Sequence, residues 1–403
     1  RRAPCQALHL PNRRGVRLPF LQRGQRDSMN DTSPLLDHCP ETLPAAAYRD
    51  PDWFARELGA IWRMSWVCVG RLADIPTGQM HRVQLGDASV ILCHQPDGTL
   101  SAFHNLCRHR GAELCALDGQ ALGKLITCPY HAWSYAAADG RLLATGHAQP
   151  TADFDRANHA LLPVAHRLWN GFVFLSAAKD PGPLTADIPL TSLDNWPMDD
   201  LVTGHTWQSD LDCNWKVFWE NYSECLHCPG IHPELCDLVP IYGKGIMGPN
   251  ETRPGEDRPD PGPNLRPGAE SWTMSGALCG PAFPNLTDAQ RQAGYTFVTF
   301  WPSAFVVAHQ DYVRSVRLQP LSPTRTRLTA EWHFAPETLA QPGFDPAEVA
   351  AFAKIVLTQD GTACEMNQRG LASPAYARGR LMPEEYEIHH FHTWVLSRME
   401  LAQ

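Results

Sequence analysis

The 403-residue chain lacks several features that would assign it to a common class. It has no run of about 18 apolar residues, the minimum for a membrane-spanning helix. It has no internal repeat, no glycine-rich phosphate loop and no dinucleotide fingerprint, so NADH has no recognisable site. Its 34 Lys and Arg are outnumbered by 43 Asp and Glu, for a net charge of −9. This balance disfavours nucleic acid as the main partner.

Cysteine and histidine are abundant, with 13 and 18 residues respectively. The cysteines are scattered and odd in number, which argues against a secreted disulfide scaffold. They favour reduced thiols and metal ligands, and with them a cytoplasmic location. Apolar residues make up 43% of the chain, enough for sizeable cores, and the length predicts two or three domains.

Residues 1–28 differ from the rest, with seven Arg, no Lys and one acidic residue, Asp27. A targeting peptide would be rich in Arg and poor in acids, and an expression leader or a misassigned start also fits. The segment shows no helical or strand period. We therefore expect a disordered leader that carries no chemistry.

The remaining chain is predicted to be of the α+β class. Short β-type runs separated by Gly, Asp and Pro between about residues 60 and 175 predict a small all-β domain. The second half mixes strands and helices that are set apart from one another, which favours an α+β domain. Helices are predicted at 50–62, 214–228, 346–371 and 384–400, strands at 204–212 and within 295–335, and a loop over 240–290.

One ligand pattern pairs Cys107 with His109 and, 18 residues further on, Cys128 with His131. Two Cys on one iron and two His on the other are the ligands of a Rieske [2Fe–2S] cluster. Zinc also accepts two Cys and two His, but its ligands are usually paired as two Cys and two His separately. Four unrelated buried residues are the remaining alternative. Nearby Cys115 is predicted to be a buried thiol.

A second pattern lies about a hundred residues later. Asn221, Glu224 and His227 recur every three residues, near one face of a predicted helix, and His232 follows a Pro-Gly break. Two His so placed can bind one metal from the same side, and a carboxylate would complete the facial triad of non-haem Fe(II) oxygenases. Such a pair is also compatible with a polar surface. A zinc site is a further alternative, with Cys225, Cys228 and Cys236.

Together these patterns resemble the catalytic α subunits of Rieske non-haem iron oxygenases over about residues 45–400. The similarity rests on CRHRGAEL (107–114), CPYHAWSY (128–135), the run from 213 to 235, and QDGTACEMNQRGL (359–371). It implies a Rieske domain at 61–180 after an N-terminal helical segment at 29–60. It also implies a helix-grip (START-like) catalytic domain with an antiparallel sheet at 181–403.

The resemblance implies the ligands of both iron sites. The cluster ligands are Cys107, His109, Cys128 and His131, and the mononuclear Fe(II) ligands are His227, His232 and Asp360. Glu365 is the second choice for the carboxylate, since Asp360 opens the D-x₄-E signature of the family. Electrons from NADH would arrive through a separate flavin and iron–sulfur reductase.

Glu224 occupies the position at which many ring-hydroxylating members have an Asp that bridges the two metal centres between subunits. With Glu at this position, the sequence resembles the group of enzymes that oxidises choline, glycine betaine, carnitine and stachydrine. The resemblance therefore implies a homotrimer in which Glu224, beside Asn221, bridges the cluster of one chain to the iron of the next. It also implies hydroxylation or N-demethylation of a quaternary ammonium compound with O₂.

A quaternary ammonium group cannot accept hydrogen bonds, so aromatic faces should hold it. Candidate pocket residues are Trp219, Tyr222, Trp272, Trp301 and Tyr312. Core packing would explain the same residues, and an aromatic substrate would use the same types. An aromatic-ring dioxygenase or O-demethylase therefore remains an alternative, and a Rieske electron carrier or a zinc-stapled protein a remote one.

Overall fold

The structure is a computed structural model that describes residues 33–248, 250–251 and 264–401. The leader predicted at 1–28 lies outside the described residues. All strand pairs are antiparallel, and helices are set apart from them, which confirms the α+β class. No helix in the described ranges is both long and apolar enough to cross a membrane.

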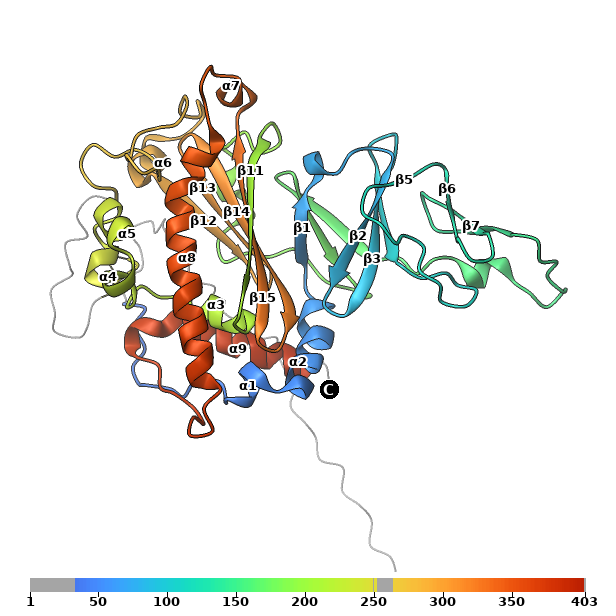
Figure 1. The fold of residues 1–403 in the computed structure, drawn as a ribbon, viewed down its shortest axis with the longest axis horizontal. Helices are drawn as coiled ribbons and strands as arrows, with labels where there is room; N and C mark the ends of the chain where they lie inside the picture. The colour runs from blue at the N-terminus through green and yellow to red at the C-terminus, as the bar shows by residue number, and fades with distance from the viewer. Residues whose placement is uncertain (1–32, 249, 252–263, 402–403) are drawn as a thin grey trace, which may run out of the picture.

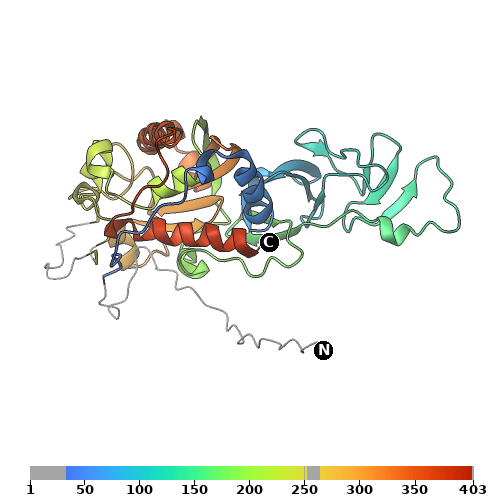
Figure 2. The ribbon, with the colours of Figure 1, turned by 90° about the horizontal axis from the view of Figure 1, so that it is seen from below.

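The first part of the chain is built of ten short strands in three sheets, ordered β1-β10-β9, β4-β3-β2-β5 and β6-β7-β8. Figures 1 and 2 show β2–β7 projecting away from the rest of the protein. Their bounds are β1 Val67–Arg71, β2 Gln79–Leu85, β3 Ala88–His94, β4 Leu100–His104, β5 Gln120–Ala121, β6 Leu125–Thr127, β7 Trp133–Ala136, β8 Leu142–Thr145, β9 Ala165–Trp169 and β10 Phe172–Ser176.

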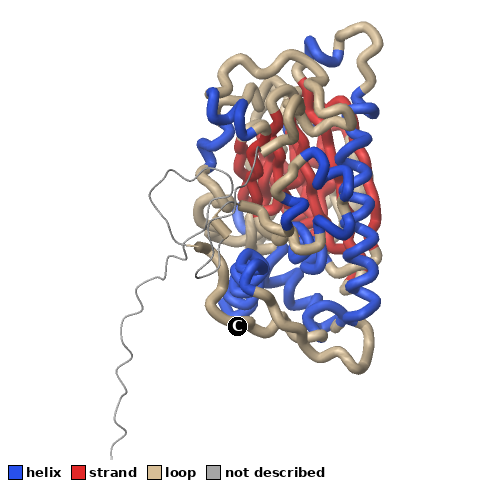
Figure 3. Tube along the Cα trace, turned by 90° about the vertical axis from the view of Figure 1, so that its left-hand side faces the viewer, coloured by secondary structure: helices blue, strands red, loops and turns tan. Residues whose placement is uncertain are grey.

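The second part is centred on a five-stranded sheet with the order β11-β15-β14-β13-β12. Its bounds are β11 Val202–Leu211, β12 Tyr295–Phe300, β13 Ala304–His309, β14 Tyr312–Ser322 and β15 Arg325–Phe334. One face packs on helices, and the other packs on β1 and β10 with the segment that follows β10. Figure 3 shows helices along one side and one end of these strands.

Two helices, α3 (Trp215–Tyr222) and α8 (Pro346–Leu371), cover the helical face of this sheet, and α9 (Tyr386–Leu401) packs against α3 at one end of the strands (Figure 1). Asn214 caps α3 by accepting the Lys216 N–H, and Asp345 caps α8 in the same way. Shorter helices are α1 Ala46–Arg49, α2 Pro51–Glu57, α4 Cys228–Ile231, α5 Pro233–Leu238, α6 Asp288–Ala293 and α7 Pro336–Leu339.

The helix predicted at 214–228 is wrong beyond residue 222, because α3 ends at Tyr222. Pro229 has no N–H, and its ring would clash with the carbonyl four residues earlier, so α3 cannot run through it. The Glu224 carboxylate also accepts the N–H groups of Leu226 and His227, which an unbroken helix would bond internally. Glu224 and His227 therefore lie on a loop, and His227 immediately precedes the short helix α4 without a side-chain capping bond.

The N-terminal segment docks onto the helical layer through buried polar contacts. Lys216 of α3 bonds Glu57 of α2 at 2.8 Å, and both side chains are fully buried. The Trp215 indole N–H donates to the same Glu57 carboxylate, and the Tyr48 hydroxyl donates to Glu220 at 2.7 Å. These bonds fix the start of α3, and with it the loop that carries His227.

Candidate metal centres

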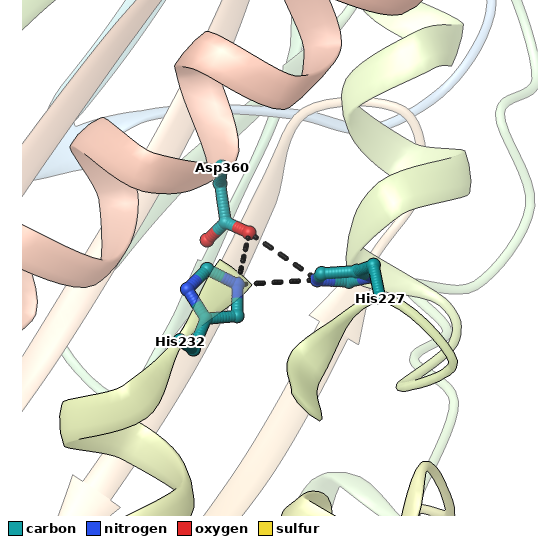
Figure 4. A group of neighbouring side chains, drawn as sticks. All are labelled: His227, His232 and Asp360. Atoms are coloured by element: carbon teal, nitrogen blue, oxygen red, sulfur yellow. Dashed lines mark hydrogen bonds and ion pairs between the residues drawn. The ribbon is translucent and has the colours of Figure 1, made fainter. Parts of the chain in front are cut away.

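Three side chains from distant segments converge between α4 and α8. His227 precedes α4, His232 lies between α4 and α5, and Asp360 projects from α8 (Figure 4). His232 Nε2 lies 3.2 Å from His227 Nε2 and 2.9 Å from Asp360 Oδ1. Within the described ranges this is the only group of three or more Cys, His, Asp or Glu ligand atoms that all lie within 4.8 Å.

The other nitrogen of each imidazole has a partner that fixes the ring. Glu224 Oε1 lies 2.5 Å from His227 Nδ1, and Gln359 Oε1 lies 2.8 Å from His232 Nδ1. The Gln359 amide in turn donates to Glu234 at 2.9 Å. These bonds leave both Nε2 atoms pointing at Asp360, an arrangement typical of the shell around a metal site.

The site stabilises positive charge. Burial opposes the imidazolium form of His227, but hydrogen bonds with Asp360, Cys228 and Glu224 outweigh it and raise its pKa to about 12. Burial also disfavours the Asp360 carboxylate, but hydrogen bonds from both histidines hold its pKa below the usual range. A divalent cation can supply the same positive charge, so the donor set fits Fe(II) bound by two His and one carboxylate.

Asn221 and Glu365 lie in different places relative to this group. Asn221 Nδ2 is 3.5 Å from His227 Nε2, at the edge of the ligand set. Glu365 instead accepts the N–H of Asp212 at 3.1 Å, one turn of α8 or more beyond Asp360. Geometry thus favours Asp360 over Glu365 as the carboxylate.

The three cysteines of the zinc alternative do not form a ligand group of their own. Cys228 Sγ is 3.9 Å from His227 Nε2, and Cys236 Sγ points at the Cys228 carbonyl at 3.3 Å. Neither they nor Cys225 belong to a converging group in the part of the chain that the structure describes.

The first ligand pattern lies on two loops of the strand-rich part, one after β4 and one between β6 and β7. Cys107 and Cys128 are buried, whereas His109 is exposed and His131 half-buried, with ring centroids 4.7 Å apart. Gly146, just after β8, packs against the second loop. A Cβ atom at this position would lie 2.3 Å from the His131 carbonyl oxygen, so the close approach requires glycine. The thiols thus lie inward and the imidazoles outward, as an inner and an outer iron would need.

The surroundings of these loops fit a two-iron cluster better than one ion. The four side chains supply no set of three ligand atoms within 4.8 Å, whereas one tetrahedral zinc would draw all four together. The Tyr135 hydroxyl lies 3.1 Å from Cys107 Sγ, and His109 stacks on Trp133 at 4.7 Å. Cys115, as predicted, is a fully buried thiol.

The five aromatic candidates are spread along the helical layer. Trp219 is fully buried, and its indole donates to the Pro302 carbonyl. Trp272 and Tyr312 are also buried and joined by a 2.8 Å bond from the Tyr312 hydroxyl to the Trp272 carbonyl. Half-buried Tyr222 stacks on Phe305 at 4.3 Å, and half-buried Trp301 packs on Phe391 and Trp394 of α9. Four of them belong to one core cluster, in which Trp219 and Tyr222 are in ring contact at 5.5 Å, and Trp272 belongs to another cluster.

Sequence reasoning missed two groups of polar residues near this site. Gln359 and Glu234 hold His232, and only the position of Gln359 beside Asp360 could have signalled this role. Arg314 and His309 are buried on the helical face of the sheet. Nothing in the sequence distinguishes Arg314 from Arg317, the other arginine of its strand.

Family models match both parts of the chain. Residues 65–155 match the Rieske [2Fe-2S] domain, and residues 198–401 match the catalytic domain of the ring-hydroxylating α subunit. The chain therefore belongs to the ring-hydroxylating α-subunit family of Rieske non-haem iron oxygenases. A Rieske electron carrier would need only the first match.

Within this family, the chain is similar to oxygenase subunits of two named monooxygenases. The chain is 32% identical to the glycine betaine monooxygenase oxygenase subunit of Chromohalobacter salexigens, an alignment covering 89% of this chain and 87% of the relative. It is 26% identical to the carnitine monooxygenase oxygenase subunit of Escherichia coli K12, over 87% and 92% of the two chains.

Solved structures show the same fold. The quaternary ammonium Rieske monooxygenase CntA superposes with a TM-score of 0.63 at 20% identity, covering 89% of this chain and 95% of that one. Naphthalene 1,2-dioxygenase from Rhodococcus sp. gives 0.58 at 16% identity, covering 89% and 94%. The predicted Rieske and helix-grip architecture is confirmed.

The protein is thus an oxygenase that uses O₂ and electrons from a separate reductase, and its cofactors are a Rieske cluster and a mononuclear iron. NADH acts through that reductase, as is typical of the family. Zinc-stapled and electron-carrier alternatives do not fit these matches.

Proposed function

We propose that the protein is the oxygenase component of a quaternary ammonium monooxygenase. His227, His232 and Asp360 would hold the mononuclear iron, whose free coordination positions activate O₂ when it is bound. The observation that carries the proposal is the convergence of these three ligands in a chain that is 32% identical to a glycine betaine monooxygenase subunit.

The strand-rich part would hold the Rieske cluster. Cys107 and Cys128 would bind the buried inner iron, and His109 and His131 the outer iron, which their exposure leaves open to an approaching partner. Tyr135 would stabilise the Cys107 thiolate through its hydroxyl. The division into 29–60, 61–180 and 181–403 is our proposal for the domain limits.

The reaction consumes one O₂, two electrons and two protons. One oxygen atom enters a C–H bond on a carbon attached to the quaternary nitrogen, and the other leaves as water. If that carbon is a methyl group, the hydroxymethyl product releases formaldehyde and a proton and leaves the demethylated tertiary amine. Aromatic faces such as those of Tyr222 and Trp272 would stabilise the cationic head.

Electron delivery would require a second copy of the chain. A flavin and iron–sulfur reductase would reduce the cluster, and a head-to-tail homotrimer would place it beside the iron of the next chain. Glu224 already holds His227 at 2.5 Å, so a neighbour's His131 or His109 bonding the same carboxylate would complete the bridge. We also propose a cytoplasmic location, where a pool of NADH is available.

A substrate panel tests this function. Holoenzyme with a surrogate reductase is offered glycine betaine, carnitine, choline and stachydrine, beside an aromatic acid, an aryl methyl ether and naphthalene. We expect NADH- and O₂-dependent product, including formaldehyde where a methyl group is lost, with quaternary ammonium compounds alone. Turnover of only the aromatic compounds would establish a dioxygenase or O-demethylase instead.

The metal content gives a second prediction. We expect three irons and two acid-labile sulfides per chain, because the cluster and the mononuclear site use separate ligands. Elemental analysis and sulfide assay of purified protein measure both. An Fe(II) chelator should remove about one iron of the three, because a His–carboxylate site releases metal more readily than a thiolate-bound cluster. Zinc without labile sulfide would contradict the proposal.

Gln359→Leu gives a third prediction. Leu cannot accept a hydrogen bond from His232 Nδ1, so the imidazole loses the partner that orients it. The affinity for Fe(II) should fall by about 10–100-fold, the usual cost of removing such a partner. Fe(II) titration of chelator-treated protein measures the change, with exposed Thr358→Ala on the same helix as control. Equal affinity in Gln359→Leu and wild type would show that Gln359 has no such role.

A further inference from the structure

Arg314 is a buried cation that no anion of the described residues pairs with. It lies on β14, is 4% exposed, and makes no hydrogen bond or ion pair with any described residue. Its Nε is fully enclosed without a partner. An unpaired buried charge is strongly destabilising, so proteins rarely keep one unless something else binds it.

The other buried cations of the described ranges each donate at least one hydrogen bond, although Nε and Nη1 of Arg71 have no partner. Lys216 bonds Glu57 and Asn214, and Arg71 donates from Nη2 to the Met198 carbonyl at 2.6 Å. Arg317, three residues along the same strand, pairs with Glu331 at 2.8 Å. Arg314 is therefore an exception within its own sheet.

His309 is a second buried group without a partner beside Arg314. It is fully buried on β13, and neither ring nitrogen has a hydrogen bond. Burial, reinforced by the Arg314 charge, holds its pKa well below the usual range, so the ring is neutral and keeps one N–H donor. Both residues thus offer donors that no described acceptor takes.

Register places both side chains on the helical face of the sheet. Arg314 pairs across the strands with Val307 and Trp332, which belong to the core shared with α8. His309 lies two residues from Val307 and so on the same face. This is the face over which α8 holds Asp360.

The neighbours of Arg314 connect it to the iron site. Its Cζ lies 5.9 Å from the Trp272 ring, which is 5.5 Å from the His309 ring. Burial lowers the pKa of Arg314, and the charges of Tyr312, Tyr222 and Asp360 partly offset that effect. The Asp360 charge thus acts on Arg314, but the two form no ion pair.

We propose that Arg314 and His309 bind the carboxylate of the substrate, which is a quaternary ammonium acid. This inference rests on the proposed function and adds the chemical class of the substrate. The carboxylate satisfies both unpartnered donors, and the cationic head lies among aromatic faces towards His227, His232 and Asp360. Guanidinium binds carboxylates through paired hydrogen bonds, which also orients the molecule.

Charge then decides between related substrates. Glycine betaine and carnitine carry the carboxylate that pairs with Arg314. Choline has the same cationic head but leaves Arg314 unpaired and brings a second positive charge towards it. The enzyme therefore discriminates by the anionic end of the substrate, not by the head that all these compounds share.

A substrate-side experiment tests this without a mutation. Wild-type holoenzyme is compared on glycine betaine, its methyl ester and choline, with kcat/KM and binding by calorimetry as readouts. The ester keeps the cationic head and removes only the negative charge. We expect kcat/KM to be at least about 100-fold lower for the ester and for choline, since losing a buried charged partner has effects of this size. Values within about threefold would overturn the proposal.

The matched variants are Arg314→Gln, Arg314→Lys and the control Arg327→Gln. Arg327 lies on the adjacent strand β15, where it pairs with Asp210 at the surface. We expect Arg314→Gln to lose at least about 100-fold in kcat/KM for glycine betaine but to gain with choline, because the positive charge that repels choline is removed. Arg314→Lys keeps the charge and should lose less with glycine betaine. Arg327→Gln should match wild type. Iron content and the Rieske spectrum confirm that each variant is folded.

The outcomes separate this inference from the proposed function. Turnover of all quaternary ammonium compounds, with equal losses for betaine and choline in Arg314→Gln, overturns the carboxylate site and leaves the function standing. Binding of an aromatic carboxylate that depends on Arg314, without turnover of any quaternary ammonium compound, overturns both the function and the substrate class. Binding of neutral aromatics that is unaffected by Arg314→Gln likewise overturns both.

Discussion

His227→Ala is expected to abolish oxygenation and leave the Rieske spectrum and its reduction unchanged. Alanine removes one of three ligand atoms that lie within 4.8 Å of one another, so the mononuclear iron should be lost. Product formation should fall by at least about 10³-fold, or about 4 kcal/mol in the activation barrier. The strand-rich part holds none of these three ligands, so its visible absorbance should persist. Product assays and absorption spectra before and after dithionite measure the two effects.

The reciprocal variant is Cys128→Ser. It should bleach the visible spectrum and stop NADH-dependent turnover, while Fe(II) binding at His227, His232 and Asp360 remains near wild type. A serine hydroxyl is a far poorer ligand than a thiolate for the inner iron. Loss of the cluster in His227→Ala, or loss of the mononuclear iron in Cys128→Ser, would show that the two sites are not independent.

Local patterns account for what could be predicted from the sequence. The strands predicted within 295–335 and the helix predicted at 346–371 follow from short-range periodicity, and the structure has β12–β15 and α8 there. The Cys–His pairs are also local, since each half of the pattern lies on one loop. Asp360 is 128 residues from His232, and only the family signature indicated it.

The features that were predicted wrongly or missed from the sequence are those that tertiary contacts determine. The end of α3 was misplaced because helical spacing over Asn221, Glu224 and His227 outweighed the constraint that Pro229 imposes on preceding residues. The consequence is chemical, because the loop turns the Glu224 carboxylate back onto His227. Arg314 was missed because an unpaired side chain can be recognised only when all its neighbours are known.

Glu224→Gln is expected to slow electron transfer between subunits by about 10²–10³-fold. Such a loss corresponds to removing one charged partner from a buried hydrogen-bonded pair, about 2–5 kcal/mol. In one chain Glu224 is largely buried and accepts bonds from His227 Nδ1 and two backbone N–H groups. Gln keeps the size but carries no charge, and its amide nitrogen cannot accept those backbone bonds.

The contact between Glu224 and His227 also predicts that Glu224→Gln weakens Fe(II) binding. If Glu224 did not contact His227, replacing it would leave the iron content unchanged. Glu224 does contact this ligand, and a carboxylate that orients a ligand contributes to metal affinity. We therefore expect Glu224→Gln to bind Fe(II) about 10–100-fold more weakly, and the rate must be measured at saturating Fe(II). Exposed Glu348→Gln on α8 is the matched control and should behave as wild type.

Single-turnover kinetics of the pre-reduced, iron-saturated protein separate the two roles of Glu224. The oxidation rate of the Rieske centre after O₂ and substrate are added reports transfer between subunits, and the Fe(II) titration reports ligand orientation. If Glu224 only orients His227, saturating Fe(II) restores a near-normal oxidation rate, and the bridge must lie elsewhere. If it bridges the centres, the rate stays low with the site full, because the neighbouring imidazole has lost the anion that would hold it against His227.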